Sequence, residues 1–137
     1  MFLLDTNVVS ELRPGKPRQD ERVRSWASRH GADQFYLSAV TVLELEIGVL
    51  RMERKDAAQG RTLRAWVNQL VQQFSARTLP FTARTALRCA ALQVPDLRSF
   101  RDSMIAATAQ EHSLTLMTRN VSDFAGLKLL VVNPWDT

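Results

Sequence analysis

Apolar and polar positions along the chain form two kinds of run, and the two kinds follow one another. Short apolar runs are typical of buried strands, whereas longer runs with an apolar residue every three or four positions indicate helices. The runs that predict strands are residues 2–4, 34–37, 77–79, 114–117 and 128–132. The runs that predict helices are residues 19–30, 41–54, 61–74, 83–93 and 100–112. Strands that alternate with helices predict an α/β fold, with a mostly parallel sheet covered on both faces.

Two neighbouring helical runs differ in how their apolar residues are spread. Residues 41–54 are apolar on nearly every side, which indicates burial on more than one side, in the core or against a partner. In residues 61–74, Trp66, Val67 and Leu70 follow one separate stripe. A single domain covers only part of such a surface, and exposed apolar patches generally mark association sites. We therefore expect a homodimer and an apolar groove that accepts a helix from a partner protein.

The length of 137 residues predicts a single domain over residues 1–137, large enough for one core without disulfides. The formal net charge is +4, and the 18 basic residues include 15 arginines. The planar guanidinium binds phosphate with two parallel hydrogen bonds, which a lysine ammonium does not do. This balance favours a nucleic-acid partner without establishing one.

Several classes are disfavoured by composition. No apolar run approaches the ~20 residues of a membrane helix, and no basic region precedes Asp5 as in a secretory signal. Cys89 is the only cysteine, so no internal disulfide forms, and His30 and His112 do not have zinc-ligand spacing. We expect a cytoplasmic protein that makes no use of the membrane.

Four acidic residues lie at or just beyond the ends of predicted strands: Asp5, Glu44, Asp102 and Asp123. Each has a structural interpretation. Asp5 can cap a helix, and Asp123 can belong to a turn or a short helix start. Glu44 and Asp102 stand three residues after a threonine or serine, as in a capping box. In a parallel sheet, however, all four converge on one edge, where active sites form.

Carboxylates gathered in this way repel one another and raise one another's pKa unless a cation compensates them. Hard oxygen ligands suit Mg²⁺ or Mn²⁺ rather than zinc. A cap and a ligand role are compatible, because the same helix start can present both. The pattern therefore predicts a site for Mg²⁺, with Mn²⁺ as the alternative.

Four blocks carry a resemblance to a known family. They are residues 5–11 (DTNVVSE), 38–48 (SAVTVLELEIG), 102–109 (DSMIAATA) and 116–124 (LMTRN followed by Asp-Phe). In this order and at these intervals, they resemble the VapC/FitB-type PIN-domain toxins of bacterial toxin–antitoxin pairs. The resemblance extends from residue 2 to about residue 135.

The resemblance implies a three-layer α/β sandwich with a five-stranded parallel sheet. It also implies a homodimeric, metal-dependent endoribonuclease that a cognate VapB/FitA-like antitoxin inhibits within a larger assembly. By motif position, Asp5, Glu44, Asp102 and Asp123 form the catalytic and metal-binding site, with Thr6, Thr118 and Asn120 as polar support. Many PIN domains carry an acid where this chain has Asn120, so Asp123 is favoured as the fourth acid over the nearby Asp96.

The family implies tRNA or another structured RNA as substrate. Asp5, Glu44 and Asp102 are expected to hold one Mg²⁺, and Asp102 with Asp123 to share a second. Metal-assisted in-line attack by water then leaves a 5′-phosphate and a 3′-hydroxyl. Three arginines that flank the acidic blocks are candidates for binding substrate phosphates: Arg98, Arg101 and Arg119.

Two alternatives remain open. A small-molecule phosphatase of the haloacid-dehalogenase type also begins with an acid after its first strand, but it needs a second Asp two residues later, where this chain has Asn7. No glycine-rich phosphate loop is present either. The other alternative is a non-catalytic RNA- or antitoxin-binding module, which gains nothing from keeping four acids.

Overall fold

A computed structural model describes residues 1–137, and its centre is a five-stranded sheet. The strands are β1 (Phe2–Leu4), β2 (Phe35–Ser38), β3 (Thr78–Leu79), β4 (Thr115–Met117) and β5 (Val131–Val132). Their order in the sheet is β3-β2-β1-β4-β5, and every neighbouring pair is parallel. The predicted α/β class and parallel sheet are confirmed.

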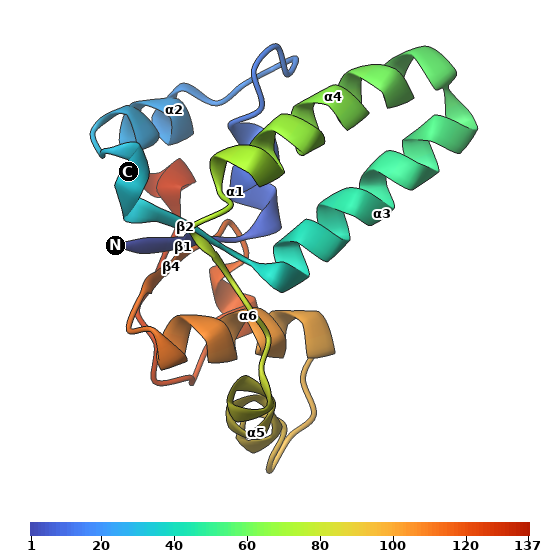
Figure 1. The fold of residues 1–137 in the computed structure, drawn as a ribbon. Coiled ribbons are helices and arrows are strands. Elements are labelled where there is room, and N and C mark those ends of the chain that lie inside the picture. Colours follow the sequence, from blue (N-terminus) through green and yellow to red (C-terminus); the bar gives the residue numbers. More distant parts are fainter.

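Helices cover both faces of this sheet. The α-helices are α1 (Thr6–Glu11), α2 (Glu21–Ser28), α3 (Ala39–Lys55), α4 (Ala57–Gln73), α5 (Ala83–Ala91) and α6 (Phe100–Glu111). Three short 3₁₀ helices complete the fold: η1 (Ala32–Gln34), η2 (Val121–Phe124) and η3 (Pro134–Asp136). The first four helices lie on one side of the sheet and α5 and α6 on the other, which gives three layers (Figure 1).

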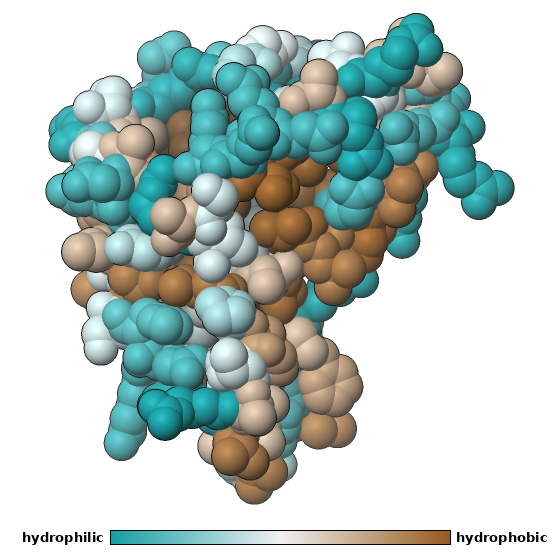
Figure 2. Space-filling view, in the orientation of Figure 1, coloured by the Kyte–Doolittle hydropathy of each residue, from teal (hydrophilic) through white to brown (hydrophobic).

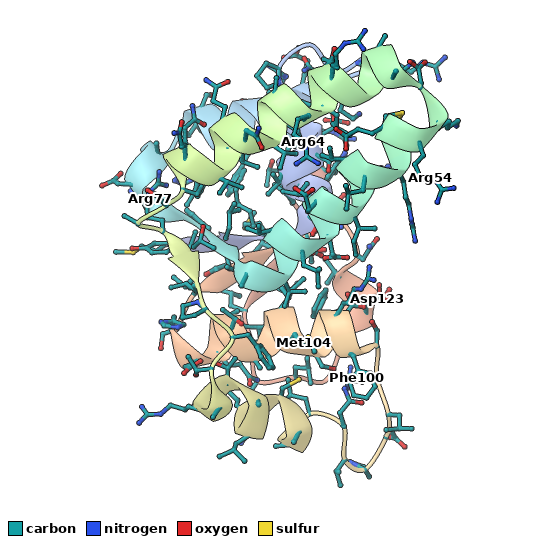
Figure 3. The ribbon with its side chains drawn as sticks, turned by 45° about the vertical axis from the view of Figure 1, so that its right-hand side comes forward. Arg54, Arg64, Arg77, Phe100, Met104 and Asp123 are labelled. Atoms are coloured by element: carbon teal, nitrogen blue, oxygen red, sulfur yellow. The ribbon has the colours of Figure 1, made fainter.

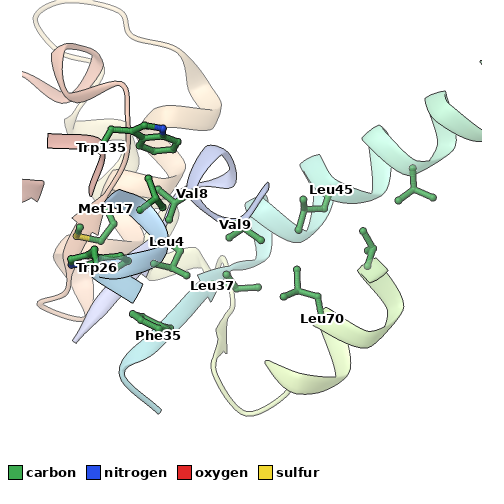
Figure 4. Packing of buried hydrophobic residues seen from close by; sticks show 13 residues of the cluster. Leu4, Val8, Val9, Trp26, Phe35, Leu37, Leu45, Leu70, Met117 and Trp135 are labelled. Carbon is green, nitrogen blue, oxygen red and sulfur yellow. The ribbon is translucent and has the colours of Figure 1, made fainter. Parts of the chain in front are cut away.

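Adjacent residues of one strand point to opposite faces, so the sheet separates two apolar clusters. Leu4 and Met117 belong to the cluster beneath α2, α3 and α4, shown in Figure 4. Leu3 and Leu116, one position earlier in each strand, belong to the cluster against α6, with Ile105. Burial on both faces explains why these strands are apolar throughout rather than alternating.

Helix boundaries differ from the predicted ones where a cap residue starts the helix earlier. Ser38 accepts a hydrogen bond from the Val40 backbone N–H, so α3 begins at residue 39 rather than 41. Asp56 accepts one from the Gln59 N–H, so α4 begins at residue 57 rather than 61. Helix α1 was not predicted, because six residues are too few to show a helical period.

Helices α3 and α4 form a long hairpin that projects from the sheet (Figure 1). Arg64 of α4 points towards α3 (Figure 3) and holds Glu46 through two contacts of 2.7 Å, with a second ion pair to Glu53 at 3.2 Å. The Val67–Leu70 stripe of α4 packs into the core, as do Leu45 and Val49 of α3.

Part of α3 stays exposed. The side chains of Leu43 and Leu50 are each 52% exposed, so this chain alone does not bury α3 on all sides. Apolar side chains gather along this hairpin on the face seen in Figure 2. No helix of the structure combines the length and apolarity that crossing a membrane requires.

Candidate active site

Parallel strands β1 and β4 are paired, so their carboxyl ends lie at the same edge of the sheet. Asp5 follows β1 directly and Thr118 follows β4. The backbone N–H of Asp5 still pairs with the Met117 carbonyl at 3.0 Å. Asp5 also caps α1, since its Oδ1 accepts a hydrogen bond of 2.8 Å from the Thr6 N–H. The capping interpretation of Asp5 is therefore confirmed, and it leaves Oδ2 facing the next strand.

A polar network fixes the second oxygen of Asp5. The fully buried Thr118 hydroxyl donates to Asp5 Oδ2 at 2.8 Å, and the Asn120 backbone N–H donates to Thr118 Oγ1 at 3.1 Å. Thr118, expected from the resemblance to be a polar support, thus contacts the Asp5 carboxylate directly. Asn120 takes part through its backbone, and its side chain makes no hydrogen bond in this network.

Asn7 belongs to the same network, a role that the sequence argument did not assign. Its Nδ2 donates to Thr118 Oγ1 at 3.3 Å and reaches Asp5 Oδ2 at 3.5 Å, while its Oδ1 accepts from the Arg119 N–H at 3.2 Å. The position of Asn7 in the sequence could have predicted this role. A polar residue two places after Asp5 lies on the first turn of α1, at the same edge of the sheet.

Glu44 reaches the site from inside α3. The predicted capping box between Thr41 and Glu44 is wrong, because Ser38 is the cap and Thr41 is fully buried. Glu44 therefore has no capping role. Its Oε1 accepts a hydrogen bond of 2.8 Å from the Thr6 hydroxyl. Thr6 therefore also supports an acid, as predicted.

The other two acids come from the segments around β4. Ser99 caps α6 and accepts from the Asp102 N–H at 3.5 Å, which confirms one half of that capping box. Asp123 lies in η2 and is exposed, on the side of the molecule where α3 and α6 approach each other (Figure 3). Its placement in a short helical turn agrees with the structural interpretation made from the sequence.

The charges of neighbouring acids act on the pKa values of both Asp5 and Asp102. Burial raises the pKa of Asp5, hydrogen bonds from Thr118 and Thr6 oppose the rise, and the charges of Glu44 and Asp123 add to it. Burial also raises the pKa of Asp102, as do the charges of Asp5, Asp123 and Glu44. Asp123 is among the causes of both shifts in pKa, and Asp96 is not.

Positive charge at the site is scarce. Arg101 forms the one ion pair with these acids, at 3.7 Å from Glu44. The Arg119 guanidinium stacks over the Trp135 ring, and Arg98 donates to the carbonyl of Ala125, two residues after Asp123. Neither arginine forms an ion pair with the acids. Four carboxylates facing a single guanidinium have a deficit of positive charge that a divalent cation suits.

The donor chemistry fits a hard cation, because only carboxylate, hydroxyl and amide oxygens are present. The acids nevertheless stand apart, since no three of them form a group compact enough to hold an ion as they lie. The site is also open. A cavity of about 850 Å³ between α5, α6 and the segment 126–130 is lined by none of the four acids. An open acidic edge suits a polymer better than an enclosed small molecule.

Comparison with known proteins agrees with this geometry. The family model described as "PIN domain" matches residues 2–127. The chain is 37% identical to "Toxin FitB" of Neisseria gonorrhoeae, over 98% of this chain and 99% of the relative. It is 33% identical to "VapC ribonuclease Y4jK" of Sinorhizobium fredii, over 99% of both.

Solved structures show the same relationship. The crystal structure of FitAcB from N. gonorrhoeae superposes with a TM-score of 0.88 at 36% identity, over 100% of both chains. FitAB bound to an IR36 DNA fragment gives 0.86 at 35% identity, over 98% of this chain and 96% of that one. The chain belongs to the PIN-domain family. Its relatives named here are FitB- and VapC-type proteins.

Proposed function

We propose that this chain is a single PIN domain that acts as the endoribonuclease toxin of a toxin–antitoxin pair, dependent on Mg²⁺ or Mn²⁺ and acting on tRNA or another structured RNA. Three contacts at one edge of the sheet support the proposal. Thr118 donates to Asp5, Thr6 donates to Glu44, and Arg101, the neighbour of Asp102, pairs with Glu44. The charge of Asp123 acts on both Asp5 and Asp102. The ribonuclease and toxin names of the chain's relatives also support the proposal.

Asp5, Glu44 and Asp102 would hold one ion, with Asp102 and Asp123 towards a second. Such an ion polarises water and stabilises charge on the phosphate oxygens. Thr118 and Thr6 orient Asp5 and Glu44, because their hydroxyls donate hydrogen bonds to these two carboxylates. Arg101 and Arg119 offer guanidinium groups to substrate phosphates at this edge.

No histidine is placed to move protons here. His30 packs 4.7 Å from the Phe2 ring centroid among aromatic residues, and His112 caps the far end of α6. Cleavage through a histidine pair acting on the 2′-hydroxyl is therefore disfavoured. The products expected are a 5′-phosphate and a 3′-hydroxyl.

The alternatives are less well supported. A phosphatase needs an acid at position 7, where Asn7 is engaged with Thr118 and the Arg119 N–H. A purely RNA-binding module would be weakened by the half-buried or exposed charges of Glu44, Asp102 and Asp123, since phosphate repels them.

The deciding experiment is cleavage of bulk tRNA by wild type, Asp5→Asn and Asp102→Asn, with Mg²⁺ or with EDTA. We expect wild-type cleavage only with the metal, no cleavage by either variant, and unchanged circular dichroism. Glu21→Gln, an exposed acid on α2, is the matched control and should cleave normally. Full activity of both Asn variants would refute the site, and activity in EDTA would refute the metal.

The proposal includes an antitoxin and a second copy of the chain. A groove of about 750 Å³ lies between α3 and α4 and is lined by Val42, Leu43 and Val71. It is an apolar surface that an antitoxin helix could bind. A separate apolar surface over α5 and the start of α6 suits a second copy. Its most exposed members are Leu87, Val94, Leu97 and Phe100.

Light scattering and inhibition assays test these surfaces separately. Leu97→Glu should lower the mass of the isolated protein from dimer to monomer. Leu43→Glu should leave the dimer intact but prevent inhibition by the product of the neighbouring gene. A wild-type monomer whose activity ignores that neighbour would refute the toxin assignment and leave the nuclease chemistry standing.

A further inference from the structure

Both carboxylate oxygens of Glu44 are already engaged within the chain. Oε1 accepts the 2.8 Å hydrogen bond from Thr6, and Oε2 lies 3.7 Å from Nη1 of Arg101. The second contact is an ion pair without a hydrogen bond, since charged N–H···O bonds are about 2.7–2.9 Å long. The Arg101 side chain is 52% exposed, against 23% for Glu44. Arg101 is therefore held loosely and from the solvent side.

A guanidinium in this place competes with a metal ion for the same oxygen. It also repels the ion directly, because two positive charges within a few ångströms interact strongly at a half-buried site. The separation of the acids agrees with this competition. While Glu44 faces Thr6 and Arg101, no three acids form a compact ligand group.

Arg101 is also the neighbour of Asp102 on the first turn of α6. Its long side chain can leave Glu44 without leaving the acidic edge. The guanidinium is more weakly hydrated than an ammonium and matches the geometry of a phosphate. An RNA backbone brought to the four acids would offer such a phosphate at the same edge.

Building on the proposed function, we infer that Arg101 is a positioning residue that neutralises Glu44 until a divalent cation replaces it, and that its guanidinium then binds a phosphate of the RNA. Metal binding and RNA binding are thereby coupled through one side chain. Arg101 therefore has opposite effects on the two ligands: it weakens binding of the ion and strengthens binding of the RNA. A residue with a merely structural role does not produce effects of opposite sign.

The test is a calorimetric titration with Mn²⁺ in the absence of RNA, paired with KM measurements on bulk tRNA at saturating Mn²⁺. In Arg101→Gln we expect the Kd for Mn²⁺ to fall roughly 3- to 10-fold, the effect of removing one nearby positive charge at a partly screened site. The KM for tRNA should rise by a similar factor. Arg101→Lys keeps the charge, so its Kd for Mn²⁺ should stay near that of the wild type while KM recovers only in part.

Arg84→Gln is the matched control, because Arg84 is an exposed arginine on α5 without an ion pair to the acids. It should change neither Kd nor KM. If the wild type binds Mn²⁺ and Arg101→Gln binds it equally well or more weakly, the inferred role of Arg101 is refuted and the metal site stands. Wild type that binds no Mn²⁺ would overturn the metal site itself, and the inference with it.

Discussion

The Thr118 hydroxyl donates a hydrogen bond of 2.8 Å to Oδ2 of Asp5, and it joins residues 113 positions apart in the chain. Both side chains are buried, so this contact is shielded from water. It opposes the rise in the pKa of Asp5 that burial causes. The hydroxyl thus favours the charged form of a buried carboxylate at the point where the proposed function needs a ligand.

Thr118→Val removes this donor while keeping the shape of the side chain. We expect cleavage to fall roughly 10- to 100-fold, the usual cost of losing a hydrogen bond that orients a metal ligand. Thr118→Ser keeps the hydroxyl and should retain most of the activity. Initial rates at several Mg²⁺ concentrations measure both variants. Equal activity of Thr118→Val and wild type would contradict the role of the hydroxyl.

The stability of the metal-free protein should depend on pH through Asp5 and Asp102. Their pKa values are raised above the ordinary 3.8, so the folded state holds these protons more tightly than the unfolded state. The resulting stabilisation is complete below the ordinary pKa and is lost as pH rises through the raised values. Asp5→Asn removes one such group. The stability of the variant relative to the wild type should therefore increase as pH rises towards neutrality.

Urea unfolding in EDTA over this pH range measures the difference in the free energy of unfolding between the two proteins. Added Mg²⁺ at neutral pH should then stabilise the wild type more than the variant, because binding to the folded state adds to its stability. A difference that stays constant with pH would show that Asp5 carries no unfavourable charge.

Asp123 and Asp96 are two candidates for the fourth acid, and they should respond differently to the same change. Asp123 raises the pKa of both Asp5 and Asp102, whereas Asp96 affects neither. We expect Asp123→Asn to lower cleavage by roughly 10-fold or more, as for other disturbed metal sites. Asp96→Asn should leave it unchanged. The reverse result, measured on the same RNA, would move the site towards the α5–α6 loop.

Two glycines of the α3–α4 hairpin make a matched pair for stability. A Cβ added to Gly60 would lie 2.7 Å from the Glu53 Cα, so Gly60→Ala should push the helices apart at a cost of about 1–3 kcal/mol. Gly48 has open space around it within α3. Gly48→Ala should therefore stabilise the protein by up to about 1 kcal/mol, through helix propensity. Thermal unfolding of both variants distinguishes close packing from a general glycine effect.

Local patterns were sufficient to predict the parallel sheet, the order of strands and helices along the chain, and the place of Asp5 directly after a strand. The reason is that a strand buried on both faces must be apolar throughout, and a helix must repeat its apolar positions. The expectation that all four acids follow strand ends is wrong, because Glu44 lies inside α3 and Asp102 lies on the first turn of α6. Asp5 and Thr118 end neighbouring parallel strands, so their meeting follows once the strands pair. The four blocks of family resemblance added the assignment of the acids to one kind of chemistry.

Contacts between distant segments were decided only by the tertiary structure. Ser38 rather than Thr41 caps α3, although both are fully buried, and no local pattern separates two capping candidates three residues apart. The hydrogen bond from Asn7 to Thr118 joins α1 to the end of β4, and the pairing of Arg101 with Glu44 joins α6 to α3. Such contacts depend on how helices pack across the end of the sheet. The periodicity of side chains does not predict that packing, because it indicates only which face of each element is buried.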